Sequence, residues 1–184
     1  ADPFRERTPD VRTVYDAARA HAKDRYLAAL LAPHDARDDL VTVAAYVGEL
    51  ERIPTVTNDA TIGEIRFQWW RDALAAPAGT ASGHPVADAV RALAARRGLP
   101  AALLALPIEG YARVLYQDGI GDESGLLAYA DETDGSAIRL ALAVLGGFED
   151  GYAQKLVLPA AGALAATRLA LTLPQHLAFD RLPL

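Results

Sequence analysis

The chain has 184 residues, enough for one domain with a buried core, and 52% of them are apolar. It contains no cysteine, which excludes disulfides, thiolate zinc sites and a cysteine nucleophile. Its net charge of −6 argues against nucleic acid as the main partner. We therefore expect one domain over residues 1–184, with residues 1–9 extended or left over from an expression vector.

Alanine and leucine dominate the apolar residues, and no stretch shows the alternation of a strand, so the pattern predicts an all-α fold. Pro33 and Pro54 are expected to end helices, because proline lacks the amide donor and disfavours a helical residue before it. Gly135 is expected to kink one helix, Pro159 to interrupt another, and the chain after residue 174 to be irregular. The predicted helices span residues 10–31, 35–52, 59–76, 85–97, 101–118, 124–145 and 150–173.

The most apolar stretch, residues 160–173, is interrupted by Arg168 and is shorter than the ~20 residues of a membrane-spanning helix. No secretory leader is recognisable at the start of the sequence. We therefore expect a cytoplasmic protein, and peripheral contact with a membrane stays open.

Both tryptophans of the chain lie in the predicted helix 59–76. Ile62, Ile65, Trp69 and Trp70 recur at helical spacing and predict a wide apolar face. We expect both indoles to be buried in the core.

The start of this helix carries several polar side chains. Thr61 and Glu64 have the spacing of a capping box, and Asn58 or Asp59 could act as the cap instead. The competing interpretation is that Asn58, Asp59 and Glu64 form a polar cluster at the mouth of a cavity. Helix capping is the more common use of such residues.

Two aspartates later in the chain, Asp131 and Asp134, lie three residues apart and would share one face of a helix. Such a pair can hold Mg²⁺ together with substrate phosphates, or it can simply form a solvated face. The four histidines have no spacing typical of a metal site. We therefore assign no catalytic residue and no metal ligand from these patterns.

Several stretches resemble the squalene/phytoene synthase family, and the resemblance runs from about residue 24 to the end of the chain. The most specific is I-G-E-I-R-F-Q-W-W-R-D-A-L at residues 62–74. Others lie at residues 24–33, 45–50, 83–88, 129–135 and 171–176. The resemblance implies an all-α, single-domain, isoprenoid-synthase-like helical bundle around a central cavity. The bundle is expected to be incomplete at the C-terminal end of this chain.

Active members of this family join two prenyl diphosphates head to head, and the resemblance implies two aspartate-rich motifs that hold Mg²⁺ against the diphosphates. Placed on the family without gaps, the motif positions hold no carboxylate, the residues being Pro54, Asn58, Thr172 and His176. The position of a diphosphate-binding arginine holds Leu171. A shift of one residue would let Asp59 restore part of the first motif.

With its aspartate motifs weakened, the chain looks most like the branch of the mitochondrial respiratory complex I assembly factor of this fold and its bacterial relatives. That resemblance implies a protein without synthase activity and without a cofactor, which binds an isoprenoid or other lipid, or a protein partner in respiratory complex assembly. The alternative is a Mg²⁺-dependent head-to-head prenyl diphosphate transferase (squalene or phytoene synthase type) with relocated ligands, Asp59, Asp131 and Asp134. The candidates for lining a ligand cavity are Tyr46, Asn58, Asp59, Arg66, Asp131, Asp134 and His176.

Overall fold

The computed structural model describes residues 9–57, 59–77, 79–116, 122–147 and 150–178, with side chains described between residues 11 and 171 of these ranges. The described residues form helices and the turns that join them, which confirms the predicted all-α fold. The helices are α1 (Pro9–His21), α2 (Lys23–Leu30), α3 (His34–Val56), α4 (Ala60–Ala75), α5 (Pro85–Arg97), α6 (Ala101–Val114), α7 (Glu123–Ala130), the π-helical turn η1 (Asp131–Gly135), α8 (Ser136–Val144) and α9 (Gly151–Ala178).

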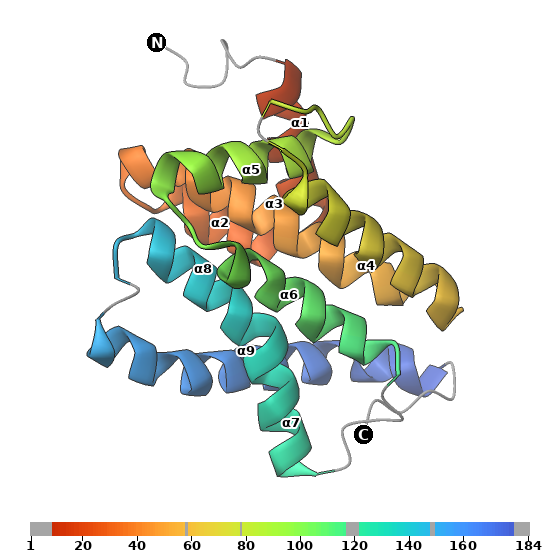
Figure 1. Cartoon of the computed structure of the whole chain (residues 1–184). Coiled ribbons are helices and arrows are strands. Elements are labelled where there is room, and N and C mark those ends of the chain that lie inside the picture. Colours follow the sequence, from red (N-terminus) through yellow and green to blue (C-terminus); the bar gives the residue numbers. More distant parts are fainter. Residues whose placement is uncertain (1–8, 58, 78, 117–121, 148–149, 179–184) are drawn as a thin grey trace.

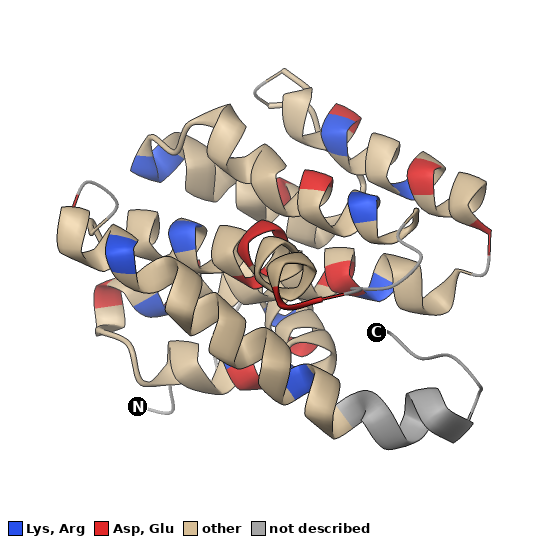
Figure 2. Ribbon diagram, turned by 90° about the horizontal axis from the view of Figure 1, so that it is seen from below, with Lys and Arg blue, Asp and Glu red and all other residues tan. Residues whose placement is uncertain are grey.

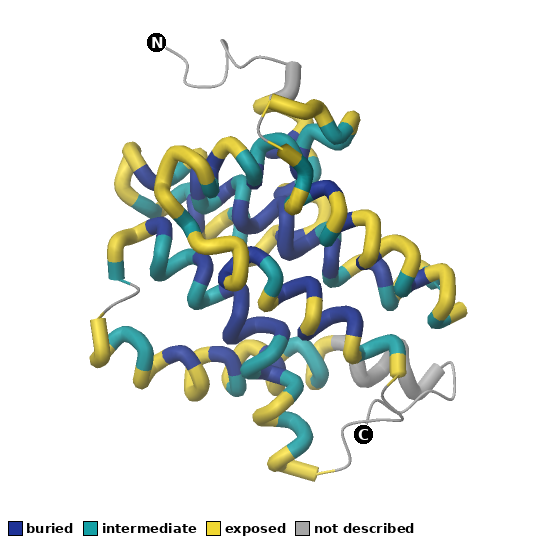
Figure 3. The backbone as a smooth tube through the Cα atoms, in the orientation of Figure 1, coloured by how far each residue is buried: buried dark blue, intermediate teal, exposed yellow. Residues whose placement is uncertain are grey.

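Helix α3 is the centre of the bundle. It packs against α1, α2, α4, α5, α6 and α8, and most of its residues between Val41 and Leu50 are buried (Figures 1 and 3). Helix α9 runs across the opposite side of the molecule and packs on α7, η1 and α8. The core therefore lies around α3, and α9 closes the bundle from below in the view of Figure 1.

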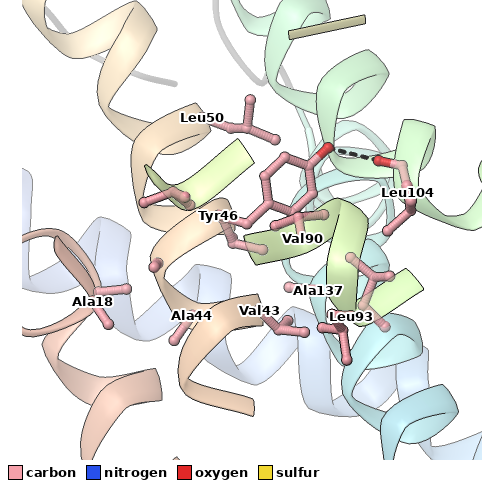
Figure 4. Packing of buried hydrophobic residues seen from close by; sticks show 14 of the residues in the cluster. Ala18, Val43, Ala44, Tyr46, Leu50, Val90, Leu93, Leu104 and Ala137 are labelled. Carbon is pink, nitrogen blue, oxygen red and sulfur yellow. Dashed lines mark hydrogen bonds between the residues drawn. The ribbon is translucent and has the colours of Figure 1, made fainter. Parts of the chain in front are cut away.

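Tyr46 is a fully buried core residue in the middle of α3. Its hydroxyl donates a hydrogen bond of 2.7 Å to the backbone carbonyl of Leu104, which ties α3 to α6 (Figure 4). Its ring packs on Trp70 of α4, with the ring centres 5.3 Å apart. A buried phenol needs such a partner, because an unsatisfied hydroxyl in an apolar core is costly.

Helix α5 begins and ends where the sequence predicts. Pro85 occupies the first turn, where its missing amide donor costs no helical hydrogen bond. Gly98 follows the helix in the left-handed conformation, with φ of 65°, and its amide donates back to Ala94. Both signals are local, so the sequence is sufficient to locate them.

Several prolines lie in helix interiors, two of them where a helix end or a break was predicted. Pro54, Pro107 and Pro159 all lie inside helices, so the predictions that α3 ends before Pro54 and that Pro159 interrupts α9 are wrong. Buried neighbours such as Ile53 hold the chain in the helix, and tertiary packing outweighs the local preference. The backbone of α9 also continues past residue 174 to Ala178, where an irregular tail was predicted.

Two predicted helices are divided. The segment 10–31 breaks at Ala22, whose φ of −144° and ψ of 56° are not helical, into α1 and α2. The segment 124–145 was predicted to kink at Gly135. In the structure, a π-helical turn over Asp131–Gly135 separates α7 from α8. Such a turn inserts one residue into a helix and re-aims the side chains around it.

Helix α4 buries only one side. Gly63, Phe67, Trp70 and Ala73 face the bundle, whereas Trp69 on the other side keeps 39% of its surface exposed. The prediction that both indoles are buried is therefore wrong for Trp69. The physical reason is that α4 lies at the edge of the bundle, where it packs mainly on α3, α5 and α6 and leaves its outer side uncovered.

Helix α9 carries almost no charge along its outer side. Figure 2 shows it as the nearly tan helix that leads into the grey C-terminal part. Between Leu156 and Leu171 its one charged residue is Arg168, which turns inward. Among the described residues, no helix is both long enough and apolar enough to cross a membrane.

A close approach between α6 and η1 gives a stability prediction. A Cβ atom at Gly110 would lie 2.1 Å from the backbone oxygen of Glu132, so Gly110→Ala should lower the free energy of unfolding by about 3 kcal/mol. At Gly151, nothing lies within 4 Å of the added Cβ, so Gly151→Ala should be close to neutral. Urea unfolding of both variants measures the difference; equal stabilities would contradict the close approach.

Candidate functional site

A cluster of five charged side chains lies where α2, α3, η1 and α9 meet. We call Asp24, Arg25, Glu51, Asp134 and Arg168 the arginine–carboxylate cluster. The guanidinium of Arg25 donates to Glu51 at 2.8 Å and forms a close pair with Asp134. The guanidinium of Arg168 donates to Glu51 at 2.6 Å and to Asp24 at 2.7 Å, and lies 3.5 Å from Asp134. Both arginines therefore bridge several carboxylates.

Helical spacing explains why these side chains point inward. Arg168 follows the buried residues Ala161 and Ala165 by seven and three positions, so it lies on the same side of α9. Arg25 likewise precedes the buried Ala29 of α2 by four positions. Asp134 lies within the π-helical turn between small buried residues, which leave room for the incoming guanidinium groups.

The cluster is partly shielded from water. The side chain of Asp134 keeps 3% of its surface exposed, that of Arg25 15% and that of Arg168 25%. Interactions between charges strengthen as water is removed, and removing one partner of such a pair leaves a charge that water cannot solvate. The cluster therefore holds the four elements together as a unit.

Burial and the neighbouring arginines shift the pKa values of the cluster's carboxylates in opposite directions. Burial raises the pKa of Asp134 above its ordinary value, and Arg25 and Arg168 oppose that rise without cancelling it. Burial alone would also raise the pKa of Asp24, but Arg168 and Arg25 outweigh burial and lower it. Burial raises the pKa of Tyr111, whose hydroxyl lies 3.5 Å from Glu51 and stays protonated.

The described members of the predicted cavity set do not gather at one place. Tyr46 is in the core, with its hydroxyl bonded to a backbone carbonyl. Asp59 caps α4 by accepting from the amide of Thr61 at 2.8 Å, in agreement with the capping interpretation. Arg66 is exposed on α4. Asn58 and the side chain of His176 lie outside the described residues.

The two aspartates of the π-helical turn have different partners. Asp131 accepts from Arg139 at 2.6 Å, whereas Asp134 accepts from Arg25. They therefore do not converge on a shared ion site. Within the part of the chain that the structure describes, no group of three or more histidine, cysteine, aspartate or glutamate side chains could hold a metal ion.

Sequence reasoning singled out Asp134 but missed Arg25, Glu51 and Arg168. One signal was available for Arg168, because a lone charge in an apolar helix commonly has a buried partner. Glu51 and Arg25 are separated from their partners by many residues, and nothing in their local sequence distinguishes them from solvated charges.

Comparison with protein-family models matches residues 18–184 to the squalene/phytoene synthase family. The chain belongs to this family. Separate searches of curated proteins and of solved structures found no match. The match confirms the resemblance of the sequence to squalene/phytoene synthases, and with it the all-α isoprenoid synthase type of fold. A central cavity in this squalene/phytoene synthase family member stays a prediction.

Removal of one arginine tests the cluster. Arg25→Met should lower the free energy of unfolding by about 3 kcal/mol, because it leaves the buried carboxylate of Asp134 without its closest partner. Arg113→Met, which removes an arginine with 60% of its side chain exposed, should change stability by less than about 1 kcal/mol.

The double variant Arg25→Met/Asp134→Asn should lose less than the sum of its two single variants, since no lone charge remains. Chemical denaturation of all four variants measures these differences. Additive losses would show that the two side chains are not coupled.

The lowered pKa of Asp24 predicts a pH dependence. Because the folded-state pKa lies below the ordinary value of 3.8, Asp24 adds stability above that pH, and this contribution is lost as the pH falls through the lower folded-state pKa. Asp24→Asn should therefore be less stable than the wild type by a constant amount above about pH 5, and the gap should close below about pH 3. Urea midpoints measured across this range test it, with Asp16→Asn on the exposed side of α1 as the control for one lost charge.

Proposed function

We propose that this member of the squalene/phytoene synthase family has no synthase activity and acts by binding. Its ligand is an isoprenoid or other lipid, or a protein partner in the assembly of a respiratory complex. The observation that carries the proposal is that the carboxylates of Asp24, Glu51 and Asp134 are all held by Arg25 and Arg168.

Head-to-head prenyl transfer releases diphosphate, and divalent cations and arginines stabilise that charge. Mg²⁺ is usually held by one or two carboxylates together with the phosphates of the substrate. In this chain the interior carboxylates already have guanidinium partners. A metal would have to displace Arg25 or Arg168, which would then be left partly buried and without a counter-charge.

The residues at the motif positions support the same conclusion. Pro54 lies in the last turn of α3, and proline offers no metal ligand from its side chain. Leu171, at the position of the diphosphate-binding arginine, keeps 74% of its surface exposed on α9. The relocated set of the alternative transferase, Asp59, Asp131 and Asp134, is divided between a helix cap and two separate ion pairs.

The proposed partners are a lipid or a protein, with no nucleic acid and no cofactor. The protein partner is proposed on the resemblance of the sequence to the branch of the complex I assembly factor. The proposal includes peripheral contact with a membrane from the cytoplasmic side, because respiratory complexes are located in a membrane.

Incubation with farnesyl or geranylgeranyl diphosphate and Mg²⁺ tests the loss of synthase activity. We expect no squalene or phytoene, with an active family member as the control for the assay. Native mass spectrometry of protein purified without detergent, and mass spectrometry of partners captured from membranes, should find a bound lipid or a respiratory complex protein. Clear formation of either hydrocarbon would restore the transferase interpretation.

A further inference from the structure

A groove of about 380 Å³ lies between the last turns of α3, the outer side of α4 and the start of α5. We call it the tryptophan groove. Its apolar wall is made by Ile53, Val56, Ile65, Trp69 and Trp70. It is separate from the arginine–carboxylate cluster, none of whose residues lines it.

Large apolar side chains remain exposed in this groove. Ile65 keeps 64% of its surface exposed, Val56 52% and Trp69 39%, while Trp70 beneath them is buried. The ring of His84 packs on both indoles, with ring centres 5.4 Å and 5.2 Å apart. The indoles are therefore held in place, and the exposed apolar surface is a fixed feature of α4.

Two arginines lie at the rim of the apolar wall. The one described hydrogen bond of the Arg66 side chain goes to the hydroxyl of Thr57, at 3.3 Å, and involves no carboxylate. Arg52 keeps 47% of its side chain exposed and lies 3.9 Å from Glu49. On another side of α4, Arg71 is paired with Glu64 at 2.7 Å and with Glu109 at 2.8 Å. Arg66 thus offers the groove a positive charge without a described carboxylate partner, whereas the charge of Arg52 is partly offset by Glu49, which also lines the groove.

One buried polar atom at the wall of the groove, Nδ1 of His84, has no hydrogen-bond partner among the described residues. Buried polar atoms in native proteins nearly always have a partner, and a bound water or ligand often supplies it. His84 is itself one of the residues that line the groove.

We propose that the tryptophan groove binds a single-chain lipid with an anionic head group. The chain lies on Ile65, Trp69 and Trp70, and the phosphate or carboxylate head lies at Arg66 and Arg52. The volume falls within the range of about 300–1,000 Å³ of small-molecule sites. Arginine is well suited to such a head group, because its planar donors match phosphate and carboxylate oxygens.

Intrinsic fluorescence can follow this binding directly, because both tryptophans of the chain line the groove. Titration of the full chain with dodecyl phosphate below its micelle concentration should change the emission in a saturable manner. Dodecanol, which lacks the charge, should bind at least about tenfold more weakly, and inorganic phosphate, which lacks the chain, should have no effect. No saturable response to dodecyl phosphate, or an equal response to inorganic phosphate, would overturn the proposal.

Matched variants place the binding in the groove. Ile65→Glu and Arg66→Glu change exposed residues, so both should fold, and both should weaken dodecyl phosphate binding at least about tenfold. Leu27→Glu on α2 and Arg12→Glu on α1 are the corresponding exposed controls outside the groove and should keep the wild-type affinity. Equal affinity in all four variants would contradict the site. This inference rests on the lipid-binding form of the proposed function, and its outcome is independent of the synthase assay, so failure of one can be told from failure of the other.

Discussion

Two guanidinium groups and three carboxylates meet inside the bundle, and the arrangement of the helices around them depends on that contact. Arg25 from α2 and Arg168 from α9 both bind Glu51 of α3, and both lie close to Asp134 of η1. A network of this kind stabilises the fold only when every member has its partner. A shift of any one of these elements would leave a partly buried charge unpaired, so the ion pairs fix the four elements relative to one another.

The same contact governs what chemistry the interior can perform. Carboxylates in a helical bundle can hold a divalent ion, but these have permanent cationic partners supplied by the chain itself. The raised pKa of Asp134 follows from burial, which the two arginines only partly offset. The active members of this family use metal and diphosphate, whereas the interior carboxylates of this chain are paired with its own arginines, and our proposal of a binding role rests on that difference.

Helix α4 shows how one helix can serve both the fold and a surface. Its inner side is buried through Phe67 and Trp70, and Arg71 is held by Glu64 and Glu109. Its outer side carries exposed apolar residues beside Arg66. Residues 62–74, the stretch most specific to the family, therefore divide into residues that pack in the core and residues that face solvent. Helical periodicity could not predict this division, because both sides of the helix carry apolar residues.

The sequence by itself determined the all-α class, the family, and the helix boundaries set by local caps, as at Pro85 and Gly98. The helix boundaries depend on residues within one turn of each other, whereas the fold class and the family follow from composition and from stretches along most of the chain. Only the tertiary structure decided that helices continue through Pro54 and Pro159, and that Arg25 and Arg168 meet acidic partners 109 and 117 residues away. Long-range packing overrides local preferences and pairs charges across the bundle, and neither effect leaves a periodic pattern in a single sequence.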